Sequence, residues 1–226
     1  GESVFNECKI LNSLQISLTS PLTQIKDYLC GECTSLTKIV MPLNVTEICE
    51  AAFFNCRTIT ELSIPSSVKI IGKGAFYQCG MLSKIAIPSS VNEIGEGAFY
   101  ECSALEKISI PNSIEMISDF TFYGCSKLIE VSIPSSVSSI GKAAFYNCSS
   151  LTNLKIPAIV TKIGKSAFEG CSNLMDLNIP PGIKEIKKGC FLGCSSLKKI
   201  ILPDSISAIG ESAFRGCSLI TEIVIP

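Results

Sequence analysis

The sequence predicts a solenoid of stacked, mainly β coils, with a parallel sheet along one face. Three residue types carry this prediction because each recurs every 23 positions, and a fixed period of this length is the signature of a repeat architecture. Pro recurs at Pro42, Pro65, Pro88, Pro111, Pro134, Pro157, Pro180, Pro203 and Pro226. Cys recurs at Cys33, Cys56, Cys79, Cys102, Cys125, Cys148, Cys171, Cys194 and Cys217. Phe recurs three residues before the Cys, at Phe53, Phe76, Phe99, Phe122, Phe145, Phe168, Phe191 and Phe214.

The first half of a coil is illustrated by residues 82–88. Leu82, Ile85 and Ile87 have the spacing of a short strand whose apolar side chains point inward. Pro88 ends the strand, since it has no N–H to donate to a neighbouring strand.

The second half of the coil returns the chain to the next strand. Val91 and Ile94 form a second short apolar pair, and we expect Gly95 to permit the turn that follows. Ala98 and Phe99 are expected to point inward from a single helical turn, and Cys102 closes the coil. The opposite face of the solenoid is therefore predicted to carry short strands and helical turns.

One such coil cannot fold alone, because its few inward side chains do not offset the conformational entropy of ordering 23 residues. Stacking buries the open faces of the coils and pairs their strands into a parallel sheet. We therefore expect residues 1–226 to form one domain of about nine repeats, in which each column is a line of touching side chains. The chain ends at Pro226, directly after a strand and without a polar cap, as in a truncated array.

The first coils, within residues 1–33, are irregular, as terminal coils of a solenoid usually are. Phe5 and Cys8 match the end of a coil, but two extra residues are expected between Cys8 and the segment at 18–22. Cys30 occupies the Phe column, and Cys49 replaces the turn Gly.

The recurring pattern I-P-S-S-V-x-x-I-G-x-x-A-F-x-x-C-S-x-L, seen at 64–82, 87–105 and 133–151, closely resembles the BspA-like, or Treponema-type, leucine-rich repeat. The resemblance covers essentially the whole chain. It implies a curved, right-handed leucine-rich-repeat solenoid. It also implies a surface protein that attaches to host proteins or to other cells, since many members are bacterial or protozoan proteins of that kind.

The composition argues against catalysis and against several classes of partner. The chain has no His, so the commonest general base and metal ligand are missing, and we expect no enzymatic activity, cofactor or metal site. Lys plus Arg number 19 and Asp plus Glu number 20, which gives no reason to expect nucleic acid as a partner. No apolar run approaches the roughly 18 residues that span a bilayer, so no membrane insertion is expected within this segment.

The 13 cysteines invite a redox or metal interpretation. The ladder thiols, and Cys190 in the Ala column, are interpreted as small apolar groups that fill an inward corner of each coil. Cys30 and Cys33 form a lone CxxC, for which a local disulfide or a zinc site are the alternatives.

Function is expected on the surface. One outward column on the strand face carries neighbouring opposite charges and predicts a solvated ladder of ion pairs or a polar ligand surface; it runs Lys38, Glu61, Lys84, Lys107, Glu130, Asn153, Asp176, Lys199, Glu222. The next outward column is small and neutral in its middle, at Ser63, Ala86, Ser109 and Ser132.

An aromatic column follows the Phe column directly and is expected to point outward or along one rim. It comprises Phe54, Tyr77, Tyr100, Tyr123 and Tyr146, and four of the five tyrosines of the chain belong to it. Tyr is enriched in binding interfaces, so this aromatic stripe is a candidate contact for a protein partner. The alternative is a self-stacking ladder that stiffens the edge of the solenoid.

Three interpretations of function remain open. The first is a non-enzymatic recognition or adhesion module at the cell surface or in secreted form. The second is a set of spacer repeats in a longer surface protein. The third is a cytoplasmic adaptor, favoured by the many free thiols. The sequons at Asn44 and Asn147 are compatible with secretion but decide little. The ligand and the oligomeric state are not determined by the sequence.

Overall fold

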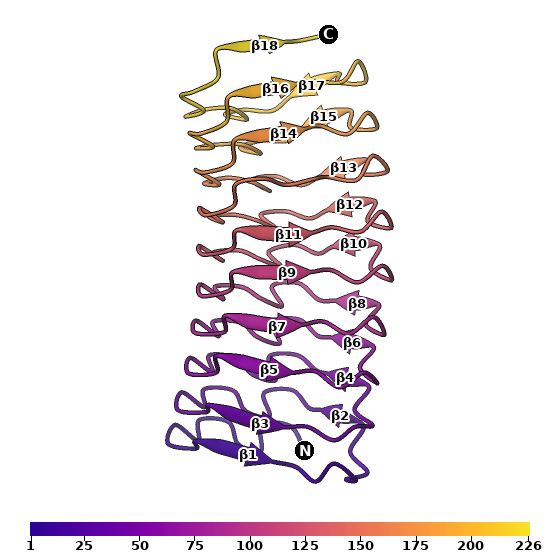
Figure 1. The fold of residues 1–226 in the computed structure, drawn as a ribbon, viewed down its shortest axis with the longest axis vertical. Helices are drawn as coiled ribbons and strands as arrows, with labels where there is room; N and C mark the ends of the chain where they lie inside the picture. Colours follow the sequence, from indigo (N-terminus) through magenta and orange to yellow (C-terminus); the bar gives the residue numbers. More distant parts are fainter.

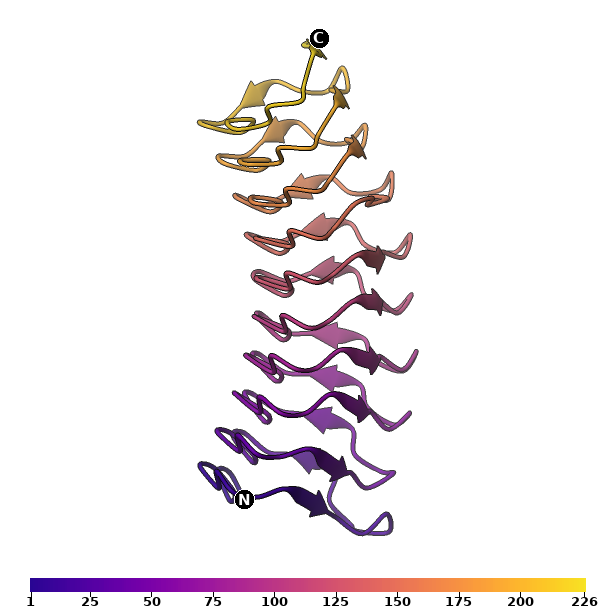
Figure 2. The same ribbon diagram turned by 60° about the vertical axis from the view of Figure 1, so that its left-hand side comes forward.

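The computed structural model describes residues 1–226 as an elongated stack of coils that advances with a right-handed path (Figures 1 and 2). The chain belongs to the predicted fold class, a parallel β-solenoid, and it contains no helix. Consequently, no helix is long and apolar enough to cross a membrane.

Most coils contribute one longer and one shorter strand. The longer strands are β1 (Ser13–Gln15), β3 (Lys38–Val40), β5 (Glu61–Ser63), β7 (Lys84–Ala86), β9 (Lys107–Ser109), β11 (Glu130–Ser132), β14 (Asp176–Asn178), β16 (Lys199–Ile201) and β18 (Glu222–Val224). One coil replaces this strand by a single bridge, from Asn153 to Asp176. The shorter strands are β2 (Gln24–Ile25), β4 (Glu47–Ile48), β6 (Ile70–Ile71), β8 (Glu93–Ile94), β10 (Met116–Ile117), β12 (Ser139–Ile140), β13 (Lys162–Ile163), β15 (Glu185–Ile186) and β17 (Ala208–Ile209).

Neighbouring coils pair in parallel, in the register that the repeat predicts. Leu62 lies opposite Ile85 on the longer strands, and Ile71 lies opposite Ile94 on the shorter ones. Pairing in the longer column is interrupted between β3 and β5, between β7 and β9, and between β11 and the bridge at Asn153, whereas β2, β4, β6 and β8 form one continuous sheet.

The predicted core columns are buried. Seven of the ladder phenylalanines, from Phe53 to Phe191, are completely inaccessible to solvent, as are the ladder cysteines from Cys33 to Cys194. Successive Phe rings stack at centroid distances of 5.4 to 5.7 Å. A continuous column of stacked rings therefore runs through the solenoid from Phe53 to Phe214.

The prediction of a helical turn before each Cys is wrong. In the coil of Phe99, Gly97 and Glu101 have positive φ angles of 59° and 54°, and the same pair of left-handed residues recurs in the other coils. In this segment, the N–H groups of Gly97, Phe99 and Glu101 donate to carbonyl oxygens of the next coil at 2.6 to 3.0 Å. The acceptors are Asp119, Thr121 and Tyr123, in that order. A helix would direct these N–H groups to carbonyls of its own segment. The turns instead form a third hydrogen-bonded ladder along the solenoid.

Gly95 does not serve the turn as predicted, because it is not in the left-handed region. A Cβ at this position would lie 2.5 Å from the backbone N of Lys73 in the preceding coil, and one at Gly72 would lie 2.7 Å from the carbonyl carbon of Cys49. This glycine column therefore allows the backbones of adjacent coils to approach closely.

The first coil departs from the period later than expected. Leu14 pairs with Ile39, 25 positions on, whereas Gln24 pairs with Glu47, 23 positions on. The two extra residues therefore lie between β1 and β2, where the loop contains Pro21. Phe5 does close a coil, since its N–H donates to Leu29 O at 2.9 Å.

Three glycine substitutions should separate two effects on stability: steric clash between the backbones of adjacent coils, and the strain of a left-handed residue. Gly95→Ala forces two backbones apart and is expected to lower the free energy of unfolding by about 1–3 kcal/mol. Gly97→Ala meets no atom within 3.6 Å but requires a left-handed residue, and it should cost about 1 kcal/mol. Gly80→Ala, which has neither constraint, is the matched control and should be close to neutral. Urea unfolding followed by circular dichroism measures all three, and equal midpoints would show that clearance at Gly95 does not constrain the stack.

Candidate functional site

The aromatic stripe lies on the turn side of the solenoid, one residue beyond the buried Phe column. Because Phe99 points to the axis, the next residue, Tyr100, is directed away from it and is half-buried, as are the other members of the stripe. The structure brings all five predicted residues, Phe54, Tyr77, Tyr100, Tyr123 and Tyr146, into one continuous line.

The four tyrosines of the stripe stack face to face. Their ring centroids are 4.3 Å apart for Tyr77 and Tyr100, 4.4 Å for Tyr100 and Tyr123, and 4.5 Å for Tyr123 and Tyr146, with planes parallel to within 2°. Phe54 joins this line at 5.4 Å from Tyr77 with a 32° tilt. The inner rings cover each other's faces, so only ring edges and hydroxyl groups remain for a partner to contact.

The surroundings of Tyr100 and Tyr146 keep these two tyrosines neutral. Burial, and then the hydroxyls of Tyr77 and Tyr123, raise the pKa of Tyr100 well above its ordinary value. Burial and the carboxylate of Glu169 in the next coil raise the pKa of Tyr146. Tyr100 and Tyr146 therefore present protonated phenols that can both donate and accept hydrogen bonds.

Polar pairs that the sequence analysis missed flank the stripe. Gln78 Nε2 donates to Glu101 Oε2 at 2.8 Å, and Asn55 Nδ2 donates to Glu32 Oε2 at 2.7 Å. Each pair joins residues 23 apart, so the period itself was the available signal. These pairs fix the rim beside the tyrosines.

The face of the longer strands is the second candidate surface. An open hollow of about 1000 Å³ lies over β3, β5 and β7 and reaches β9, and it spans the interruptions of strand pairing between β3 and β5 and between β7 and β9. Its charged lining residues are Lys38, Glu61, Lys84, Glu106 and Lys107. A smaller hollow of about 420 Å³ continues over the small column, at Ala86, Ser109 and Ser132.

The charged column on this face forms fewer ion pairs than its register allows. Glu61 and Lys84 are direct cross-strand neighbours, but within this column only Lys107 and Glu130 form an ion pair, at 2.9 Å. Both partners are largely exposed, so the pair adds little to stability. Most charges on this face are thus free to meet a polar ligand.

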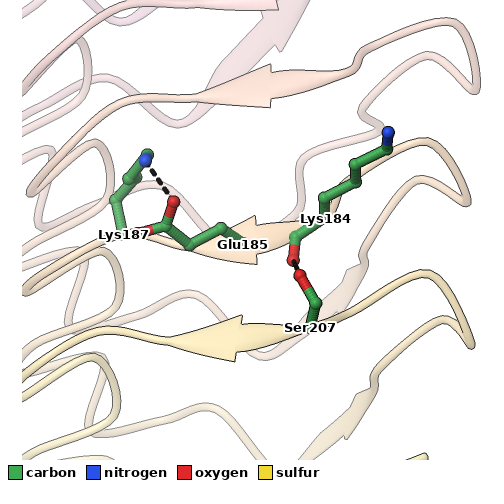
Figure 3. A network of polar contacts seen from close by, with 4 residues as sticks. All are labelled: Lys184, Glu185, Lys187 and Ser207. Atoms are coloured by element: carbon green, nitrogen blue, oxygen red, sulfur yellow. Dashed lines mark hydrogen bonds and ion pairs between the residues drawn. The ribbon is translucent and has the colours of Figure 1, made fainter.

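Polar contacts on the shorter-strand face include an ion pair and a hydrogen bond near β15 (Figure 3). Lys187 occupies the close-approach glycine column, and its ammonium pairs with Glu185 outside the stack. Ser207 Oγ donates to the carbonyl of Lys184 in the preceding coil at 3.0 Å. The first contact lies within one coil, and the second joins adjacent coils.

The cysteines are structural hydrogen-bond donors. Cys79 Sγ donates to the carbonyl of Phe53 at 3.1 Å, and the same bond recurs from most ladder thiols to the Phe column of the preceding coil. Cys30 and Cys33 are separate buried thiols, and Cys33 donates to Phe5 O at 3.0 Å. No three His, Cys, Asp or Glu side chains converge as metal ligands would.

Burial governs the ionisation of these thiols. It raises the pKa of Cys79 from its ordinary value of 9.0 to about 12 and that of Cys49 to about 11, where the carboxylates of Glu47 and Asp27 add to the effect. A nucleophilic cysteine needs a lowered pKa and an exposed, electropositive site. These cysteines have neither.

Comparison with known proteins identifies the relatives of this repeat. The family model described as the BspA type leucine rich repeat region matches residues 1–129 and 115–226. None of the curated proteins compared with the chain matches it.

Solved structures give the same result. A leucine rich cell surface protein from Faecalibacterium prausnitzii is 30% identical, with a TM-score of 0.67, over 98% of this chain and 61% of its own. The leucine-rich repeat protein TpLRR of T. pallidum is 27% identical, with a TM-score of 0.62, over 77% of this chain and 70% of its own. The pneumococcal vaccine antigen PcpA, 21% identical with a TM-score of 0.58 over 96% of this chain and 68% of its own, shares the fold. The chain thus spans less than two thirds of the first of these relatives.

Alkylation should discriminate the buried ladder from the partly exposed end of the array. At pH 9, a thiol with a pKa near 12 is ionised about five-hundredfold less than a free thiol, so Cys79 should react with iodoacetamide at least about five-hundredfold more slowly than it does in the unfolded chain. Cys8, which is partly exposed, should be modified first. Peptide mass spectrometry over time measures both rates, and comparable native rates at Cys8 and Cys79 would contradict the assignment.

The same shifts predict that the protein loses stability in alkali. The unfolded chain releases thiol protons from about pH 9, whereas folded Cys30 and Cys79 hold theirs to about pH 12. The thiol contribution is therefore fully present below pH 9 and is lost as the pH rises toward 12. The free energy of unfolding, measured between pH 7 and pH 11, should fall above pH 9. Cys79→Ala should be less stable at pH 7 but show a shallower fall, and a parallel fall would contradict this prediction.

Proposed function

Because the chain belongs to the BspA-type leucine-rich repeat family, we propose that it is a non-enzymatic scaffold that recognises a protein partner at a cell surface. The similarity to a leucine rich cell surface protein at 30% identity supports the location. The absence of His and the buried, protonated thiols support a role without catalysis.

The observation that carries the proposal is the aromatic stripe. Its residues are half-buried and already fixed by stacking, and its four tyrosines carry hydroxyls on rings spaced at a regular 4.3 to 4.5 Å. A rigid aromatic surface loses little conformational entropy on binding, which favours affinity. The partner would contact ring edges and hydroxyl groups and would not insert between the rings.

A spacer role is the second candidate, and the same stacking favours it. Rings that cover each other's faces also stiffen the edge of the solenoid, whether or not a partner is present. The two functions differ in what they require of the hydroxyls: recognition depends on them, whereas stiffening depends on the rings alone.

Variants of the stripe test this difference. The triple variant Tyr77→Phe, Tyr100→Phe, Tyr123→Phe keeps the stack and removes three hydroxyls, while replacement of the same residues by Ser removes rings and hydroxyls together. Under the recognition hypothesis, the Ser variant should lose binding by at least tenfold, since buried interface tyrosines contribute about 1–2 kcal/mol or more each. The Phe variant should show an intermediate loss. The measurement is solid-phase binding to a panel of purified extracellular glycoproteins, with thermal unfolding as the check on folding.

A matched control tests the other surface. Lys38→Ala, Lys84→Ala changes the hollow over β3 to β7 and leaves the stripe intact. If this variant loses binding while both tyrosine variants retain it, the strand face is the recognition surface and the stripe is excluded. If a wild-type protein that is shown to be folded binds no member of the panel, the spacer function is favoured.

A further inference from the structure

The four stacked tyrosines are close enough for reactions between neighbouring rings. Tyr77, Tyr100, Tyr123 and Tyr146 form three adjacent pairs, with centroids 4.3 to 4.5 Å apart and planes within 2° of parallel. The members of each pair come from adjacent coils and are held by the strand register and by the turn ladder, for example by the 2.6 Å bond from Glu101 N to Tyr123 O. The ring edges are partly open to solvent, since all four residues are half-buried.

We propose that the tyrosine stack is a site of oxidative cross-linking, at which a one-electron oxidant joins neighbouring tyrosines through a carbon–carbon bond within one chain. The chemical class of the oxidant is a peroxidase acting with hydrogen peroxide, or an equivalent photochemical one-electron acceptor. The inference does not depend on whether the stripe also binds a partner.

The reaction balances as follows. Each of two phenols loses one electron to the oxidant and one proton to water and becomes a phenoxyl radical. The radicals couple through a ring carbon next to each hydroxyl-bearing carbon, forming one C–C bond. The two hydrogens on the coupled carbons then move to the phenolic oxygens or exchange with water, which restores both aromatic rings. The product has lost two hydrogens in total, and one hydrogen peroxide accepts the two electrons and two protons to give two waters.

Proximity decides which product forms. Two radicals on separate molecules must diffuse together, whereas neighbours in the stack are already in contact, and a fixed geometry of this kind accelerates coupling strongly over the bimolecular reaction. Stacking also allows a radical formed on one ring to move to the next before it couples. Coupling requires the rings to turn at Cα–Cβ, and the open outer edge of the stripe provides the space.

Two alternative targets are less favourable. Tyr28 is the fifth tyrosine, and its aromatic neighbour is Phe54, at 6.3 Å with planes at 60°. It therefore has no tyrosine with which to couple in the same chain. The ladder cysteines are buried and donate their protons to backbone carbonyls, and oxidation of cysteine proceeds through an accessible thiolate.

The product is a covalent bond between two adjacent coils, at residues 23 apart. Since the tyrosines form three adjacent pairs, two bonds can form along one stack, one between Tyr77 and Tyr100 and one between Tyr123 and Tyr146. The modification would fasten the middle of the solenoid along its turn edge.

Two variants with equal numbers of tyrosines test the proposal. Tyr77→Phe, Tyr123→Phe leaves Tyr28, Tyr100 and Tyr146, none of which has a stacked tyrosine neighbour. The matched control Tyr28→Phe, Tyr146→Phe leaves Tyr77, Tyr100 and Tyr123 as two adjacent pairs. Both variants keep every aromatic ring, and thermal unfolding verifies that both are folded.

Wild type and both variants are oxidised with peroxidase and hydrogen peroxide at low protein concentration. Monomer is then separated, and its dityrosine fluorescence and intact mass are measured. Cleavage after Lys and Arg places each tyrosine in its own peptide, since Tyr77 lies in 74–84, Tyr100 in 85–107, Tyr123 in 108–127 and Tyr146 in 143–155. We expect monomer that has lost two hydrogens, with 74–84 joined to 85–107, in wild type and in the control. The variant without adjacent pairs should yield no joined peptides within the monomer.

Two results would overturn the proposal. One is an equal yield of cross-linked monomer in the two variants. The other is a wild-type product that is chiefly intermolecular, or that forms within one chain as readily in denaturant as in the native state. If a variant does not fold, the comparison of native with denatured wild type still decides, because only the native chain holds the rings in register.

Discussion

Every coil of this protein depends on the backbone hydrogen bonds that it forms with the coils on either side. These bonds run along two strand columns and along a third ladder in the turns, where N–H groups such as those of Gly97, Phe99 and Glu101 donate to the next coil. Because the spacing of adjacent strands is fixed, each side chain lies directly above its counterpart 23 residues earlier. Stacked Phe rings, repeated thiol-to-carbonyl bonds and the aromatic stripe are all consequences of this one constraint. The left-handed residues are a cost of forming the third ladder, offset by the hydrogen bonds that it adds.

Much of the fold could be predicted from the sequence because the constraint acts through residue type. Only an apolar side chain suits an axial position, so Phe99 and Cys102 were recognisable as core, and the 23-residue period fixed the register of pairing. The turns were harder, because a left-handed residue is recognised mainly by Gly, and this column also contains residues such as Glu101 and Asn147. The role of Gly95 was predicted wrongly for a related reason. A glycine required for the close approach of two backbones looks the same in sequence as one required for a turn.

The candidate surfaces were predictable in position but not in detail. The position of Tyr100 beside the buried Phe99 column placed it on the surface, yet whether its ring would face solvent or stack on Tyr77 depends on side-chain torsions that the repeat does not determine. The charged column shows the same limit. Register places Glu61 opposite Lys84, but long exposed side chains gain little from pairing and retain their rotamer freedom, so adjacency did not become an ion pair.

The repeat thus gives its surfaces two kinds of order. On the strand face, flexible charges surround an open hollow, so complementarity to a ligand would have to be acquired on binding. On the turn edge, Tyr77, Tyr100, Tyr123 and Tyr146 are held by their neighbours before any partner arrives. A partner that matches this edge must present groups at a similar interval, because the ring spacing cannot adjust without breaking the stack. The stacking that suggests a purely structural role is therefore also what would make this edge selective among protein partners. For the same reason, recognition at this edge would depend on the chemistry of the phenols more than on the shape of the solenoid.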